Sequence, residues 1–62
     1  MVNGEWEVKI DGRLIGFIHL EDWKYEFSSL EYDSFVVDDD ETLVEAISAC
    51  YGVQVEDLEI NW

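Results

Sequence analysis

Hydrophobic and polar positions alternate along the first half of the chain, as they do in β-strands that bury one face. The pattern begins with Trp6, Val8 and Ile10, which alternate with charged residues. The next segment is apolar on both faces, as is typical of a central strand. Turn residues at Asp11-Gly12 and at Glu21-Asp22 separate the segments. The sequence therefore predicts three consecutive antiparallel strands, at residues 5–11, 13–20 and 23–27.

The register of the first hairpin decides which apolar side chains face the core, because a shift of one residue exchanges the two faces of a strand. A two-residue loop would place Ile15 and Phe17 beside Trp6 and Val8. A three-residue loop with Gly12 in a bulge would place the even-numbered residues there instead. We expect the second arrangement, because each strand then gives its most apolar set to one face: Trp6, Val8, Ile10, Leu14, Ile18, Leu20, Trp23 and Tyr25. Ile15 and Phe17 then lie on the opposite, more polar face.

The second half of the chain predicts a helix between two short strands. Residues 34–37 indicate a fourth strand, and the acidic run that follows is typical of a helix start. Leu43, Ile47 and Cys50 recur at helical spacing, and Gly52 is a natural stop. Residues 53–62 resemble a last strand that is broken at Glu56-Asp57.

Together these elements predict one small acidic α+β domain over residues 1–62. Its sheet is mainly antiparallel with four to five strands, and one helix packs on one face, in the order β-β-β-(β)-α-β.

Composition and charge narrow the function classes. The chain carries 16 acidic residues against three Lys plus Arg, a formal net charge of −13, yet 48% of it is hydrophobic, which predicts a folded domain with a charged exterior. Residues 25–62 contain eleven acids and no lysine or arginine. A surface of this kind repels phosphate, so we expect no direct binding of nucleic acid and no binding to an anionic membrane.

The ends and apolar runs of the sequence bear on localisation. No apolar run approaches the length of about 18 residues that spans a bilayer. Met1–Glu5 lack the basic and apolar regions of a secretory signal. We therefore expect a cytoplasmic protein.

Candidate catalytic and metal-binding residues have simpler explanations. The contiguous run Asp38–Glu41 differs from a calcium loop, whose ligands alternate around a glycine, and is better explained as a helix cap, with a weak divalent-ion site as the alternative. Cys50 is in phase with the apolar face of the helix, and His19 is the only histidine, on a strand. The chain contains no phosphate-binding glycine loop and no serine nucleophile motif. We expect no enzyme activity, cofactor or metal.

The acidity itself is the strongest functional signal. Glu41 and Glu45 form a like-charge pair at i,i+4, which costs a few tenths of a kcal/mol where lysine would stabilise the helix. The net charge also exceeds the magnitude of about 2–8 that solubility requires. We therefore predict a basic protein partner, and the residues expected to bind it are Asp33, Asp38, Asp39, Asp40, Glu41, Glu45, Glu56, Asp57 and Glu59, with Ile15 and Phe17 as an apolar anchor.

In length, acidity and lack of enzymatic motifs, the chain resembles the small phage-encoded inhibitors of CRISPR effectors and restriction nucleases, some of which act as DNA mimics. The resemblance implies an inhibitor in the host cytoplasm that presents carboxylates in place of phosphates to a nucleic-acid-binding enzyme or complex. The alternative is a non-catalytic regulatory or assembly module that forms a homodimer through its sheet or the Ile15 and Phe17 patch, with acidity serving solubility or salt adaptation.

Overall fold

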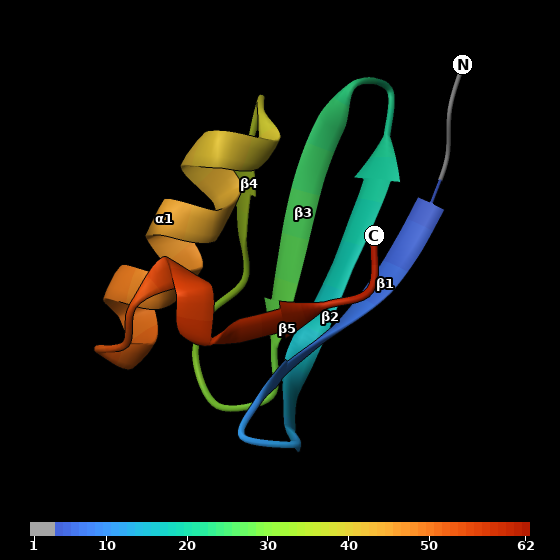
Figure 1. Cartoon of the computed structure of the whole chain (residues 1–62). Coiled ribbons are helices and arrows are strands. Elements are labelled where there is room, and N and C mark those ends of the chain that lie inside the picture. The colour runs from blue at the N-terminus through green and yellow to red at the C-terminus, as the bar shows by residue number, and fades with distance from the viewer. Residues whose placement is uncertain (1–3) are drawn as a thin grey trace.

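The computed structural model describes residues 4–62 and contains one five-stranded antiparallel sheet with neighbours in the order β4-β3-β2-β1-β5 (Figure 1). The predicted α+β class is confirmed, including the short fourth strand and the single α-helix between the fourth and fifth strands. Met1–Asn3, on which part of the signal-sequence prediction rests, lie outside the described residues. The strands are β1 Gly4–Ile10, β2 Arg13–Glu21, β3 Lys24–Ser29, β4 Phe35–Val37 and β5 Leu58–Ile60.

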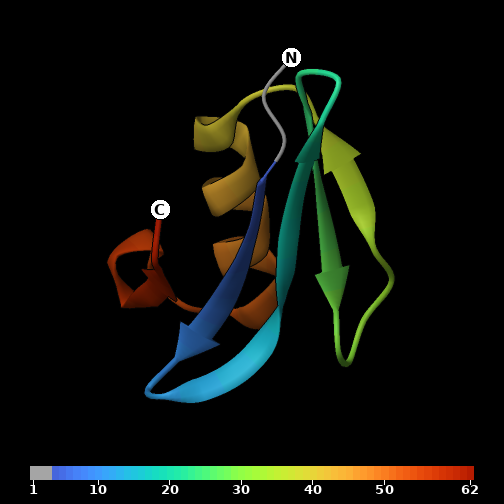
Figure 2. The same cartoon turned by 90° about the vertical axis from the view of Figure 1, so that its right-hand side faces the viewer.

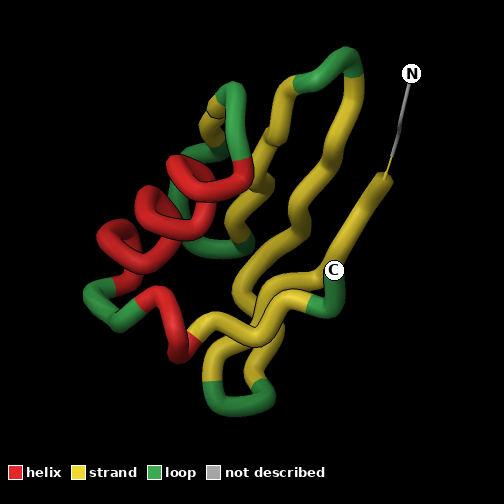
Figure 3. Tube along the Cα trace, turned by 45° about the horizontal axis from the view of Figure 1, so that its top comes forward, coloured by secondary structure: helices red, strands yellow, loops and turns green. Residues whose placement is uncertain are grey.

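Helix α1 (Asp40–Tyr51) packs on one face of the sheet, against β3 and β4, as Figure 2 shows. The predicted stop is confirmed, because Gly52 adopts a left-handed conformation with φ 68°. The chain then crosses to the far edge of the sheet, where β5 pairs with β1 (Figure 3). Within residues 4–62, no helix has the length and apolar character needed to cross a membrane.

The last strand is shorter than predicted. Val55–Asp57 form a turn of 3-10 helix, η1, and only Leu58–Ile60 pair in the sheet. The backbone N–H of Gln54 donates a hydrogen bond to the Asp57 carboxylate at 3.0 Å, which closes the turn. This local bond competes with extension, so the predicted strand at the start of residues 53–62 is wrong.

The first hairpin combines features of both predicted registers. Its loop has two residues, Asp11 and Gly12, with φ of 51° and 78°, so the predicted three-residue loop is wrong. The change of parity comes instead from a bulge inside β2, where Val8 pairs with Gly16 but the next residue of β1 pairs with Leu14. After the bulge, the even-numbered residues of β2 face the core, as predicted, and Ile18 and Leu20 are buried. Before the bulge, Leu14 pairs with Lys9 on the face away from the helix, so its predicted place in the core is wrong.

The bulge also changes the position of Ile15. As the extra residue of β2, Ile15 turns toward the helix and is 3% exposed, so its predicted place on the opposite face is wrong. Phe17 pairs with Glu7 on the face away from the helix and is half-buried, as predicted. The apolar patch expected to anchor the basic partner, or in the alternative to serve a homodimer, thus keeps Phe17 and loses Ile15.

The core lies between the sheet and α1 and contains Val8, Ile15, Ile18, Phe27, Leu43 and Ile47. The helix faces the core along Leu43, Ile47 and Tyr51, a spacing of four residues that turns Cys50 to solvent. The prediction that Cys50 is buried is therefore wrong. Ser48 is buried in its place, and its hydroxyl donates to the carbonyl of Glu45 at 2.9 Å.

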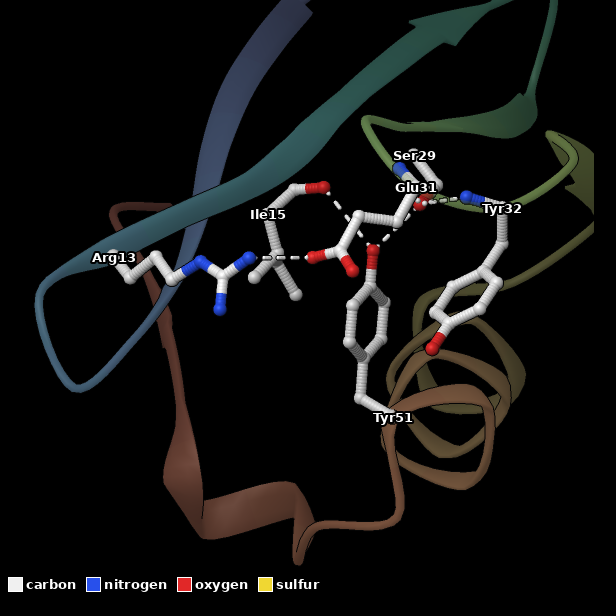
Figure 4. A network of polar contacts seen from close by, with 6 residues as sticks. All are labelled: Arg13, Ile15, Ser29, Glu31, Tyr32 and Tyr51. Atoms are coloured by element: carbon white, nitrogen blue, oxygen red, sulfur yellow. Dashed lines mark hydrogen bonds and ion pairs between the residues drawn. The ribbon is translucent and has the colours of Figure 1, made fainter.

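A polar network anchors the bulge to the end of the helix (Figure 4). The hydroxyl of Tyr51 donates to the carbonyl oxygen of Ile15 at 3.2 Å, and the backbone N–H of Leu30 donates to the same oxygen at 3.0 Å. Because Tyr51 donates its hydroxyl proton to Ile15, its oxygen acts as the acceptor for Ser29 Oγ, which donates to Tyr51 Oη 2.5 Å away. Ser29 Oγ in turn accepts the N–H groups of residues 31 and 32, at 3.1 and 2.9 Å. The network ties together β2, the β3–β4 loop and α1.

Replacing Tyr51 with phenylalanine is expected to lower the free energy of unfolding by about 1–2 kcal/mol, because Ser29 loses its acceptor and the Ile15 carbonyl loses one donor. Urea denaturation followed by circular dichroism measures the loss. Tyr32→Phe is the matched control, since Tyr32 is 51% exposed and its hydroxyl bonds to no residue between 4 and 62. Equal effects of the two substitutions would show that the network does not stabilise the fold.

Candidate functional site

A groove separates the tip of the β2–β3 hairpin from the start of α1. Its volume is about 380 Å³, and the two elements that form it lie at the same end of the molecule in Figure 1. Apolar and aromatic side chains come from the hairpin, and carboxylates come from the segment that leads into the helix. The residues that line the groove are Leu20, Trp23, Tyr25, Asp38, Asp39 and Asp40.

The hairpin places Trp23 at the mouth of this groove. Glu21 pairs with Lys24, so the loop consists of Asp22 and Trp23, with φ of 53° and 64°. The predicted turn at Glu21-Asp22 is therefore one residue early, and Trp23, expected to face the core, is 70% exposed. Tyr25 and Leu20 pair with each other on the core face, as predicted.

Trp23 occupies a position that its backbone disfavours. A two-residue loop of this kind needs positive φ at both residues, which favours glycine at the second position, as in the first hairpin. An L-residue with a bulky side chain pays about 1–2 kcal/mol there. The sequence signal that identifies both loops is an aspartate at the first loop position, Asp11 in one and Asp22 in the other.

Four consecutive acidic residues, Asp38–Glu41, which we call the acidic run, lead into the helix. Asp39 is the N-cap residue, with φ −139° and ψ 161°, and its carbonyl accepts the first helical hydrogen bond from Leu43 N–H at 3.1 Å. The Asp39 side chain, however, makes no capping hydrogen bond, so this part of the predicted capping role is wrong. Asp40 and Glu41 lie in the first turn, where their charges complement the helix dipole.

Within residues 4–62, the side chains of Asp38, Asp39, Asp40 and Glu41 form no hydrogen bond and no ion pair, and all four residues are exposed. Glu45 extends the acidic run by one turn along the exposed side of α1. The structure thus brings five of the predicted binding residues together around the helix start.

The remaining predicted acids lie elsewhere and partly serve the fold. Asp57 closes the 3-10 turn, and Glu59 accepts the backbone N–H of Gly12 at 3.1 Å, which supports the first hairpin. Glu56 is exposed on η1, which packs near the other end of α1, a helix about 18 Å long. Asp33 is exposed at the opposite end of β4 from the acidic run. These four residues are not part of one surface with the groove.

Basic side chains distinguish the groove from two other hollows of similar volume. A hollow of about 370 Å³ is lined partly by Lys9 and Glu7, whose charged groups lie 4.0 Å apart. Another, of about 400 Å³, contains Arg13, paired with Glu31 at 2.9 Å. No lysine or arginine lines the groove at the helix start, so its charge is of one sign.

Two other arrangements bear on chemistry. Among the described residues, no group of three or more His, Cys, Asp or Glu side chains is placed to hold a metal ion. His19 lies on the sheet face away from the helix, with its ring nitrogens 3.8 Å from Glu5 and 3.9 Å from Glu21. Cys50 is exposed on the helix.

Comparison with family models, with curated proteins and with solved structures finds no match for this chain.

Proposed function

We propose that this protein is a small acidic inhibitor that binds the basic nucleic-acid-binding surface of another protein, such as a CRISPR effector or a restriction nuclease. Its carboxylates take the place of the phosphates that this surface normally binds. The acidic run at the start of α1 supplies the central contacts, and Glu45 extends them. The inhibitor works by binding alone and performs no reaction.

The observation that carries the proposal is that the acidic run is exposed and free of partners within residues 4–62. Carboxylates that cap a turn or pair with arginine stabilise the fold, as Asp57 and Glu31 do. The acidic run has only the weak helix-dipole interaction to offset its own repulsion. A marginally stable small domain that carries this repulsion can recover the cost when a basic partner neutralises it.

Physical chemistry explains why carboxylates suit such a partner. Proteins that bind duplex DNA neutralise phosphates with lysine and arginine arrays and release counterions as they do so. A carboxylate offers the same arrays a charged, bidentate acceptor. Charges carried on a folded helix start need no ordering of the backbone on binding, and the long-range attraction speeds association.

Neutralising the acidic run tests the proposal. The quadruple variant D38N/D39N/D40N/E41Q keeps side-chain size and removes four charges. We expect inhibition to weaken about fourfold or more, since four exposed charge pairs at about 0.2–1 kcal/mol each contribute at least about 0.8 kcal/mol. The measurement is the concentration of the protein that halves DNA cleavage by each member of a panel of purified CRISPR effectors and restriction nucleases, at low and at moderate salt.

A variant with the same change in total charge provides the control. Glu5, Glu7, Glu21 and Glu26 are exposed on the sheet face away from the helix, and the substitutions E5Q/E7Q/E21Q/E26Q also remove four charges. Inhibition should persist in this variant and should fall as salt rises. Equal losses in the two variants, or no inhibition of any panel member by the unchanged protein, would contradict the proposal.

A further inference from the structure

We infer that the groove between the β2–β3 hairpin and the start of α1 receives an arginine side chain of the basic partner, stacked on Trp23 and hydrogen-bonded to the carboxylates of Asp38–Asp40. This inference rests on the proposed function and names the group that the site recognises. The aromatic side chains of the groove offer an apolar contact to a partner, and the aspartates beside them favour a positively charged group.

Trp23 makes no visible contribution to the stability of the fold, because its side chain is mostly exposed and its backbone conformation is unfavourable. Within residues 4–62 its ring pairs with no other aromatic ring, whereas Trp6, Tyr25 and Trp62 form a cluster with ring centroids 5.2 and 6.3 Å apart. Trp23 is 70% exposed, and its φ of 64° favours glycine at that position. A large apolar ring held at the rim of a hollow is typical of a contact residue in an interface.

The floor of the groove is apolar as well. Leu20 is 8% exposed and Tyr25 is half-buried. One side of a side chain that enters the groove therefore contacts these apolar groups in place of water. The opposite wall carries three aspartates and no base. An apolar occupant would leave these carboxylates facing an apolar group, and an acidic one would be repelled. A cationic side chain with an apolar stem can contact the aromatic wall and pair with the carboxylates of the other wall.

Arginine fits the two walls better than lysine does. Its guanidinium group is flat and weakly hydrated, so one face can stack on an indole ring while the N–H groups in its plane donate to carboxylates. The lysine ammonium group is a strongly hydrated point charge and gains less from an aromatic face. The groove therefore favours arginine over lysine, in addition to the general preference of the acidic run for positive charge.

Two synthetic peptides test this preference: a short peptide of alternating arginine and glycine, and its counterpart with lysine in place of arginine. Dissociation constants are measured by NMR titration of the ¹⁵N-labelled protein, with the indole N–H of Trp23 as the local probe. We expect the arginine peptide to bind about three- to fivefold more tightly and to shift the Trp23 indole signal.

The variant Trp23→Gly separates binding from folding. Glycine suits the positive φ of this loop position, so the melting temperature should stay the same or rise, while the two peptides should bind with equal affinity. Trp23→Asn is a second variant, because asparagine also tolerates this backbone conformation. Tyr32→Ala, which removes an exposed ring from the loop after β3, at the opposite end of that strand from Trp23, should keep the preference for arginine.

The outcomes separate this inference from the proposed function. Equal affinities of the unchanged protein for the two peptides, or a preference for arginine that survives Trp23→Gly and Trp23→Asn, would overturn the arginine groove and leave the acidic inhibitor standing. Failure of both peptides to bind at low salt would count against the proposed function and the groove together. Loss of the preference in both Trp23 variants, with the fold intact, supports the inference.

Discussion

Phe27→Ala is expected to lower the free energy of unfolding by about 3–5 kcal/mol, which is most of the stability that a domain of this size possesses. Phe27 is fully buried in the centre of β3, under the helix. Its ring lies 5.6 Å from that of Phe35 and 6.4 Å from that of Tyr51. Alanine leaves a cavity that the short strand β4 and the single helix cannot fill without losing their own contacts.

Urea denaturation followed by circular dichroism and tryptophan fluorescence measures this loss, and the variant is expected to be largely unfolded at 37 °C. Val36→Ala on β4 is the control, because Val36 is 56% exposed and its truncation should cost less than about 1 kcal/mol. A Phe27→Ala protein as stable as the control would mean that the sheet and the helix do not share one core.

Gly16→Ala is expected to cost about 1–3 kcal/mol, although it adds a single methyl group. Gly16 follows the bulge residue, and a Cβ there would lie 2.5 Å from the carbonyl oxygen of Ser28 and 2.8 Å from the ring of Phe27. The Ser28 carbonyl belongs to the backbone of the paired strand, so β2 and β3 must separate or the bulge must shift. Thermal unfolding should show a melting temperature lower by several degrees or more.

Gly4→Ala is the matched control for this effect. A Cβ at Gly4 would meet the ring of Trp6 at 2.6 Å, a side chain that can shift against Trp62 where the backbone carbonyl of a paired strand cannot. We therefore expect a clearly smaller change in melting temperature. Equal changes at the two glycines would show that the close approach of β2 and β3 is not a constraint on the sequence.

Most elements of the fold follow from local patterns in the sequence. Alternation in β1 and β3, the two apolar faces of β2, and the spacing of Leu43 and Ile47 predict the strands and the helix, and Gly52 predicts where the helix ends. These patterns act over a few residues, so they can be read without knowing which segments meet. The acidic run was also identified correctly as the helix start.

The errors that change the faces of the first three strands occur where a single residue changes the parity of a strand. A bulge at Ile15 and a loop that begins at Asp22 each move side chains to another face or out of the sheet. Alternation alone cannot locate such a step, because the apolar residues on both sides of it look equally regular. The groove at the helix start was missed for this reason, since Trp23 was expected in the core.

The sequence by itself determined the class of the fold, the position of its helix and the sign of the charge on its second half. The tertiary structure decided which carboxylates share a surface, because β4 and α1 separate Asp33 and Glu56 from the acidic run. It also decided that Trp23 lines the same groove as Asp38, Asp39 and Asp40, and that Ile15 is buried. The physical reason is that pairing of distant strands sets the register, and the register sets which side chains meet.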